Sequence, residues 1–230
     1  MYVSDIPEIL KCNNFEFADD LVILSIVKNT KDSDLLNLEN YCNEKELKLN
    51  AQKTKHLRIG LKNCNLSGYV LQNEIIETVN SHKHLGVTYD NKMSFNFHCN
   101  DIINKAYSKY NVMKHICNQV DGQTFLRIYK TYILPIIEYS NLCWTPTQTQ
   151  SDNIEKIKKR ITKYICYKLS KSGLHYEQRL NLLNLKTLKS RRDMKILKIV
   201  HKIRSHSFEI PINWFSYLNF YTTNRNAIFY

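Results

Sequence analysis

With 230 residues, the chain is long enough for one large domain or two small ones, and its apolar fraction of 43% is ordinary for a globular protein. It contains no run of about 18 apolar residues, and its N-terminus lacks the basic and apolar segments of a secretory signal, so we expect no membrane span and no secretion. The net charge of +12 is uneven, because residues 1–100 hold 11 Lys and Arg against 13 Asp and Glu, while residues 101–230 hold 22 against 8. The basic half indicates a polyanionic partner such as nucleic acid, although a soluble helical domain rich in lysine has the same composition.

The first predicted element is a hairpin in the stretch FEFADDLVIL, residues 15–24. Two short apolar strands meet at Asp19 and Asp20, which would lie at the tip although the usual turn glycine is missing. An unpaired charge is costly in a buried strand. We therefore expect the flanks to be buried and the acidic tip to be open.

The rest of the first ninety residues predicts a mixture of one helix and short strands. Residues 32–46 form a helical pattern with Asp32, Ser33 and Asp34 as possible caps. Its apolar stripe consists of Leu35, Leu38, Tyr41 and Cys42. Strand-like stretches follow at 56–59, 69–71, 75–79 and 84–89. This part of the chain is predicted to be α+β with antiparallel pieces.

Beyond about residue 94 the pattern becomes helical. The predicted helices cover residues 97–118, 123–142, 151–169, 175–183 and 187–205. Pro135 should kink or shorten the second of these, because proline removes an amide donor and clashes with the preceding turn. An aromatic-rich tail follows from Phe208 and would need a partner element, so we expect the chain to stop partway through a unit.

One helix combines an apolar stripe with a basic face. In residues 154–169 the stripe consists of Ile154, Ile157, Ile161 and Ile165. The basic residues expected to point largely outward are Lys156, Lys158, Lys159, Arg160 and Lys163. This face is the best candidate for contacts with phosphate, and a merely solvated face is the alternative. Tyr139 and Trp144 either stack on bases or belong to the core, and Arg191 and Arg192 either touch phosphate or are solvated.

The cysteines are scattered rather than paired. They stand at positions 12, 42, 64, 99, 117, 143 and 166, an odd number with no C-x-x-C arrangement. We expect reduced thiols in an intracellular protein of the cytoplasm or nucleus, without a disulfide-linked partner. The set of His82, His84, His98 and Cys99 matches no zinc-binding spacing.

Asp19 and Asp20 indicate a catalytic site only if other parts of the sequence support one. Two carboxylates on a hairpin tip suit a divalent metal, and two metals about 4 Å apart can stabilise the attacking and leaving oxygens of a phosphoryl transfer. That chemistry normally needs a further carboxylate from another strand. A lone pair of aspartates is otherwise an ordinary exposed turn.

Several other stretches supply that context when they are taken in order with FADDLVIL. VSDIPEIL precedes it, and LKLNAQKTKHLRIG, HKHLGVTYDNKMSF, TFLRIYKTYILPIIEYSNLCW and YEQRLNLLNLKTLKSRRDMKIL follow it. Together they resemble the F/Y-A-D-D hairpin and the flanking segments of reverse transcriptases from non-LTR, jockey-like retrotransposons. The resemblance covers nearly the whole chain, and the order of the motifs makes it specific.

The resemblance implies a fold and a set of site residues. Residues 1–93 would be a partial antiparallel palm and residues 94–230 an all-helical thumb and downstream connector. Asp19 and Asp20 would be the metal-binding catalytic carboxylates, with Mg²⁺ as the cofactor. Phe17 would lie beneath the primer terminus, and Gly86 would allow close approach of the backbone to the primer. Lys53 would be a third catalytic residue, which approaches the triphosphate and protonates the leaving pyrophosphate.

The implied function is RNA-directed DNA synthesis, with an RNA template and a DNA primer as partners. The family carries another catalytic Asp and a fingers region before the F-A-D-D, and Asp5 belongs to the S-D-I-P match instead. We therefore expect this chain alone to be inactive as a polymerase. One alternative is a non-enzymatic remnant that binds nucleic acid through its basic half, and another is a purely structural helical protein.

Overall fold

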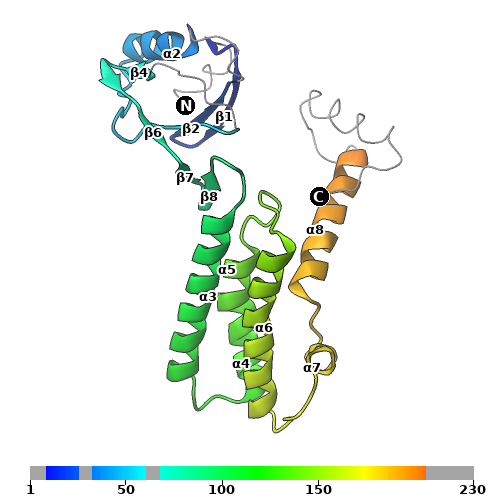
Figure 1. Ribbon diagram of the computed structural model, residues 1–230. Helices are drawn as coiled ribbons and strands as arrows, with labels where there is room; N and C mark the ends of the chain where they lie inside the picture. Colours follow the sequence, from blue (N-terminus) through cyan, green and yellow to red (C-terminus); the bar gives the residue numbers. More distant parts are fainter. Residues whose placement is uncertain (1–8, 26–32, 61–67, 206–230) are drawn as a thin grey trace. The chain divides into compact units, whose positions relative to one another are not determined.

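The structure is a computed structural model that describes residues 9–25, 33–60 and 68–205. The chain divides into two compact units, each of which is described by itself. The first unit comprises residues 1–83 and 90–93, and the second, called the helical unit, comprises residues 84–89 and 94–230. Strands are short throughout and helices predominate in the second half (Figure 1), which confirms the predicted α+β class.

Some residues singled out in the sequence lie outside the described ranges. They are Asp5, Asp32, Cys64 and the aromatic residues from 208 onward. All other candidate site residues lie within the described ranges.

Among the described residues, the strands pair two by two. The antiparallel pairs are β1 (Asn13–Phe17) with β2 (Asp20–Leu24), and β4 (Val70–Leu71) with β5 (Glu74–Ile75). A further pair is β7 (Ser81–His84) with β8 (Val87–Asp90). The expectation of antiparallel pieces is wrong for β3 (Lys55–Leu57) and β6 (Glu77–Val79), which are parallel. The connection between these two strands is long enough for the crossover that parallel strands require.

The first unit has a small core around helix α2 (Ser33–Glu44). Leu38, Tyr41 and Cys42 of the predicted stripe are buried and pack with Leu10, which confirms the inward face of this helix. The strand residues Leu21 and Ile23 are only partly buried against this cluster. Among the described residues, the apolar cluster of the first unit is smaller than that of the helical unit.

Asp34, which the sequence offers as a helix cap, ties α2 to the chain before β1. Its carboxylate accepts hydrogen bonds from the backbone N–H groups of Lys11 (3.2 Å) and Cys12 (3.0 Å). Burial raises the pKa of Asp34, but the hydrogen bonds lower it by more, so the pKa lies below its ordinary value.

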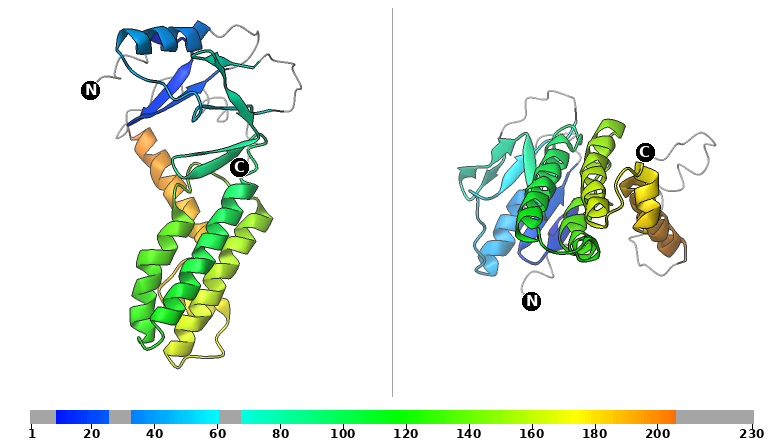
Figure 2. Two further views of the ribbon diagram at one scale, coloured as in Figure 1. Left: turned by 90° about the vertical axis from the view of Figure 1, so that its left-hand side faces the viewer. Right: turned by 90° about the horizontal axis from the view of Figure 1, so that it is seen from below.

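The helical unit is formed by elements close to those predicted. They are α3 (Asn96–Ile116), α4 (Gly122–Ile128), η1 (Tyr129–Ile133), α5 (Leu134–Glu138), α6 (Gln148–Lys168), α7 (Tyr176–Leu182) and α8 (Leu188–Arg204). Within this unit α3, α6 and the continuous α4–η1–α5 segment run side by side (Figures 1 and 2). The α6 N-terminus is a capping box, in which Gln150 Oε1 accepts from the Thr147 N–H at 2.7 Å.

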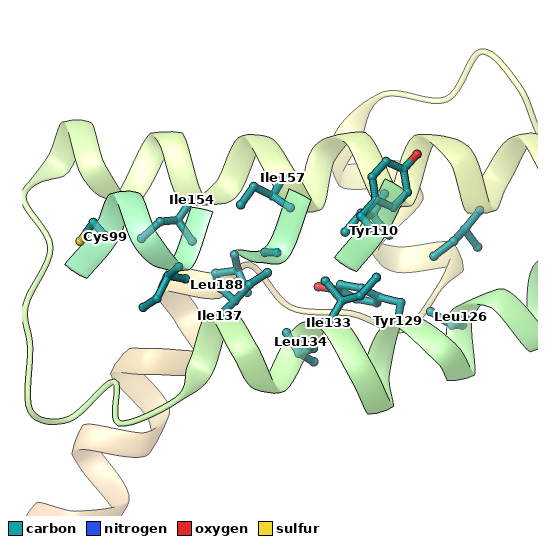
Figure 3. Packing of buried hydrophobic residues seen from close by; sticks show 14 of the residues in the cluster. Cys99, Tyr110, Leu126, Tyr129, Ile133, Leu134, Ile137, Ile154, Ile157 and Leu188 are labelled. Carbon is teal, nitrogen blue, oxygen red and sulfur yellow. The ribbon is translucent and has the colours of Figure 1, made fainter. Parts of the chain in front are cut away.

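A single large core lies between these helices. The predicted stripe of α6 is confirmed, because Ile154, Ile157, Ile161 and Ile165 are all fully buried. Figure 3 shows Ile154 and Ile157 together with Ile133 and Ile137 of the facing segment. Burying one such side chain stabilises a fold by about 1.5–3 kcal/mol.

The segment that contains Pro135 is not a simple kinked helix. Residues 129–133 form a π-helical turn, in which the Leu134 N–H donates to the Tyr129 carbonyl. Pro135 stands in the first turn of α5, where its missing N–H and its ring are accommodated by the wider preceding turn. The helix therefore widens locally before Pro135, and α5 ends at Glu138 rather than at residue 142.

Candidate nucleic-acid interface

The acidic pair lies at a tight hairpin turn, as predicted. Phe17 of β1 pairs with Asp20 of β2, so Ala18 and Asp19 form a two-residue connection. Ala18 adopts a φ of 56° and takes the left-handed position where a glycine is usual. Both aspartates are exposed. The turn therefore presents two carboxylates to solvent.

The expectation that the flanks of this turn are buried is wrong. Phe15, Phe17 and Leu24 are 45%, 62% and 50% exposed. The register places Phe15 opposite Val22, so these residues share one face of the hairpin with Asp20, whereas Leu21 and Ile23 share the other. Only the latter face packs on the small core of the first unit.

The acidic pair does not by itself complete a metal site. Mg²⁺ takes oxygen ligands in an octahedron, and two carboxylates suit it in kind. Among residues 9–25, 33–60 and 68–205, however, no group of three or more Asp, Glu, His or Cys side chains gathers where a metal could be held. The donor set described here is therefore smaller than two-metal chemistry requires.

Lys53 lies in a turn that is closed by Asn50. The Asn50 side-chain oxygen accepts from the Lys53 N–H at 2.9 Å, and the Thr54 hydroxyl donates to the Asn50 carbonyl at 2.9 Å. This is the usual way in which asparagine stabilises a turn. The Lys53 side chain is exposed.

Gly86 is required by its own surroundings. Its φ is 80°, and a Cβ built there would lie 2.9 Å from Cε1 of Tyr139. The Tyr139 hydroxyl also donates to the Leu85 carbonyl at 2.9 Å. This packing inside the helical unit accounts for the glycine without a primer, and it gives the exposed Tyr139 a structural role.

The basic face of α6 opens into a groove of about 640 Å³. Its walls come from the C-terminal half of α6, the loop after it and α7. The groove is lined by five cationic side chains, those of Lys159, Arg160, Lys163, Lys171 and Arg179. Within the part of the chain that the structure describes, none of these five forms an ion pair with a carboxylate. Their charge is therefore available to an anionic ligand.

Aromatic rings and backbone carbonyls hold several of these cations. The Lys159 ammonium lies 5.4 Å and the Arg179 guanidinium carbon 5.5 Å from the centre of the Tyr176 ring, within range of a cation–π contact. Arg160 stands 5.8 Å from the ring of Tyr107. Arg179 also donates to the Leu174 carbonyl at 2.8 Å, which ties the loop to α7.

Tyr176 is anchored in turn by Glu155 of α6. The Tyr176 hydroxyl donates to the Glu155 carboxylate, and the Leu188 N–H donates to its other oxygen at 2.9 Å. Burial and this hydrogen bond raise the pKa of Tyr176. Glu155 thus joins the beginnings of α7 and α8 to α6, behind the groove.

Lys158, which was expected to point outward, is fully buried. Its ammonium donates to the Lys186 carbonyl, and burial lowers its pKa to about 8 although Glu155 favours the charged form. The helical period explains the error, because residue 158 is four after Ile154 and three before Ile161 and so lies on the apolar stripe. Lys156 is exposed outside the groove, where it donates to Asn153.

Trp144, Arg191 and Arg192 belong to the helical core and its edge. Trp144 is 1% exposed and donates to the Tyr139 carbonyl at 3.1 Å. Arg192 is buried with its guanidinium carbon 5.3 Å from the Trp144 ring, and burial lowers its pKa. Arg191 pairs with Glu138. Neither arginine forms the open, phosphate-contacting or solvated face that the sequence suggested.

The sequence identified three of the five groove cations. Lys171 and Arg179 were missed, because only the return of the chain after α6 brings them beside Lys159 and Lys163. Tyr167, which also lines the groove and is 71% exposed, was missed as well. Its position beside the basic residues of α6 was the available signal.

Comparison with known proteins adds little. No family model matches the chain, and no solved structure matches it. The chain is similar to an uncharacterized protein of Caenorhabditis elegans, with 22% identity over 128 residues. That match covers 55% of this chain and 65% of the worm protein, so the chain spans just under two thirds of that relative's length.

Two further findings concern the helices and the cysteines. Of the helices in the described ranges, none combines the length and the apolar character that crossing a membrane requires. Six cysteines, at positions 12, 42, 99, 117, 143 and 166, carry free thiols.

Proposed function

We propose that this chain is the portion of a non-LTR retrotransposon reverse transcriptase that carries the F-A-D-D turn and the thumb. Residues 1–93 then correspond to part of a palm, and residues 94–230 to a helical thumb and connector. In the intact enzyme the primer 3′-hydroxyl would attack the α-phosphate of a nucleotide and pyrophosphate would leave, while Asp19 and Asp20 would hold Mg²⁺, which would supply charge stabilisation. RNA template and DNA primer are its proposed partners.

The basic groove of the helical unit is the observation that carries the nucleic-acid part of this proposal. Five cations line one groove and have no carboxylate partner among the described residues, and Lys and Arg in such a cluster neutralise backbone phosphates. Two of them are fixed over the ring of Tyr176. A site that is held in place before binding loses less side-chain entropy when the ligand arrives.

The polymerase part rests on the sequence resemblance and on the geometry of the hairpin turn. Asp19 lies in the two-residue connection and Asp20 directly follows it, both exposed, which is the position the F-A-D-D motif implies. A chain of residues 1–230 is proposed to bind nucleic acid without extending a primer, since the described residues supply only two of the carboxylates.

A second candidate function is a non-enzymatic nucleic-acid-binding protein. The same absence of a third acidic ligand in the described ranges favours it. Both candidates use the basic groove, and they differ only in whether Asp19 and Asp20 ever take part in catalysis.

Binding is tested first, by fluorescence anisotropy of a labelled RNA with purified residues 1–230 at several salt concentrations. If all five groove cations contact phosphate, the logarithm of the association constant should fall with the logarithm of salt with a slope of about −3.5. The double variant Lys163→Glu, Lys171→Glu should weaken binding roughly tenfold or more at moderate salt. The matched control is Lys130→Glu, Lys189→Glu, which makes the same charge change at exposed positions outside the groove.

Catalysis is tested on the same preparation by primer extension on an RNA template with Mg²⁺ and all four deoxynucleotides. No extension is expected, and Asp19→Asn serves as the paired control. Extension that disappears in Asp19→Asn would show that a further carboxylate completes the site. Affinity that is equal in the groove variant and its control, or unchanged by salt, would overturn the nucleic-acid proposal.

A further inference from the structure

The groove is lined by aromatic and apolar side chains as well as by cations. Besides the five cations it is lined by the ring of Tyr167 and by two apolar side chains, those of Cys166 and Leu174. Tyr167 is 71% exposed and follows directly on the buried Cys166 near the end of α6. An exposed aromatic ring among cations, beside apolar side chains, is the combination with which proteins hold an unpaired base and its phosphate at the same time.

The loop after α6 keeps this surface accessible. Gly173 has a φ of 85°, and a Cβ built there would meet nothing within 4 Å, so the loop backbone faces open space. The loop is held to α7 by Arg179, which donates to the Leu174 carbonyl. The groove therefore has a fixed wall and an open side.

We propose that the groove selects single-stranded nucleic acid, with Tyr167 stacking on an unpaired base while the surrounding cations contact the phosphates. This inference rests on the proposed function and names the ligand class of that same site. A duplex presents its phosphates to the groove but keeps its bases stacked inside, so it gains the cation contacts and leaves Tyr167 and Leu174 uncovered. A single strand uses both kinds of surface.

The aromatic contact and the cationic contacts are separable. Stacking does not depend on counterion release, whereas each phosphate contact does. Tyr167→Ala should therefore lower single-strand affinity without changing the salt slope, and Lys163→Ala should reduce the magnitude of that slope by about 0.7. Because Tyr167 is mostly exposed, removing its ring leaves the core of the helical unit intact.

The experiment measures the affinity of the full 230-residue chain for one RNA sequence in three forms, the single strand, the blunt duplex and the single strand with abasic sites throughout. Polyglutamate serves as a fourth ligand, an anionic polymer without bases. Wild type, Tyr167→Ala, Tyr167→Phe and Lys163→Ala are compared at several salt concentrations, with circular dichroism to check folding.

The expected result is that wild type binds the single strand more tightly than the duplex and the abasic strand. Tyr167→Ala should weaken single-strand binding about fivefold or more and leave duplex and abasic binding unchanged, while Tyr167→Phe keeps the wild-type preference. Equal affinity for single strand and duplex, with no effect of Tyr167→Ala, would overturn this inference but leave nucleic-acid binding standing. Absence of binding to any nucleic acid would overturn the proposed function as well. Polyglutamate binding as tight as that of the RNA would mean that the groove takes acidic protein segments.

Discussion

Ile161 in the helical unit is 0% exposed, whereas Phe17 and Ile75 in strands of the first unit are 62% and 77% exposed. The helical unit buries its apolar stripe because three long segments lie against one another and cover it. The first unit forms two-stranded sheets, and a pair of strands on its own has little to cover either face. The comparison teaches that the stability of the helical unit comes from its own residues, while much of the apolar surface of the first unit stays in water.

The polar groups follow the same division. The helical unit encloses charged side chains, including Lys158 and Arg192, and gives Lys158 and Glu155 specific hydrogen-bond partners. In the first unit the charged groups of the candidate site, Asp19, Asp20 and Lys53, are all exposed. Substitutions at these buried positions of the helical unit should therefore have larger effects on stability than substitutions at the exposed positions of the candidate site.

The largest expected effect on stability is found by truncating one isoleucine to alanine in each unit and comparing the results. Ile161→Ala leaves a cavity in the helical core and should lower the free energy of unfolding by about 2–5 kcal/mol. Ile75→Ala should change it by less than about 0.5 kcal/mol, because the side chain is already in water. Urea unfolding followed by circular dichroism measures both. Equal effects of the two substitutions would break the comparison.

An intermediate effect should depend on pH. The pKa of Lys158 in the folded protein is lowered to about 8, below its ordinary value of 10.5, so the unfolded chain binds more protons above pH 8 and stability rises with pH. The cost of the buried charge is fully present below pH 8, and about 1 kcal/mol of it should be relieved between pH 7 and pH 9.

Lys158→Met isolates this effect from the other groups that titrate. Burial raises the pKa of Cys99 to about 11, which works in the opposite direction above pH 9 in both proteins. The difference in unfolding free energy between wild type and Lys158→Met, measured in urea at pH 7, 8 and 9, should therefore shift in favour of wild type as pH rises. A difference that stays constant from pH 7 to pH 9 would mean that the pKa of Lys158 is not lowered in the folded protein.

The smallest expected effect has opposite signs in the two units. Ala18→Gly removes a left-handed residue that costs about 1–2 kcal/mol, but it adds roughly 0.4–1 kcal/mol of backbone entropy to the unfolded chain, so a gain of about 0.5 kcal/mol is expected. Ala106→Gly, in the buried middle of α3, should instead cost about 1 kcal/mol. Hydrogen exchange of the amides in β1, β2 and α3 reports each change locally. A loss of protection in the hairpin of Ala18→Gly would contradict the first expectation.

The sequence was informative wherever a pattern is local. The helices and the inward face of α6 follow from the spacing of apolar residues, and the hairpin follows from two short apolar runs around an acidic pair. The parallel pairing of β3 with β6 could not be predicted, because strands of three residues carry no signal for direction. The groove was found only in part, because Lys171 and Arg179 reach Lys163 through a change of chain direction that no local pattern contains.

The wrong prediction that Lys158 points outward has a different cause. The helical period already placed residue 158 on the apolar stripe, and the charge of the side chain argued against that position. A lysine can occupy such a site when its ammonium reaches a carbonyl, here that of Lys186, at the end of its apolar stem. Whether a carbonyl stands at that place depends on the packing of a segment 28 residues later in the chain.

The π-helical turn at residues 129–133 reduces the rotation that an ordinary α-helix would impose on side chains spaced four residues apart. Phe125, Tyr129, Ile133 and Ile137 recur at every fourth position, and all are buried. In an α-helix each four-residue step overshoots a full turn by about 40°, so three steps would carry Ile137 about 120° away from the direction of Phe125. One wider turn takes up part of that drift and keeps the row facing the same neighbours. A strict four-residue spacing ahead of a proline is thus a pattern by which such turns can be sought in other sequences.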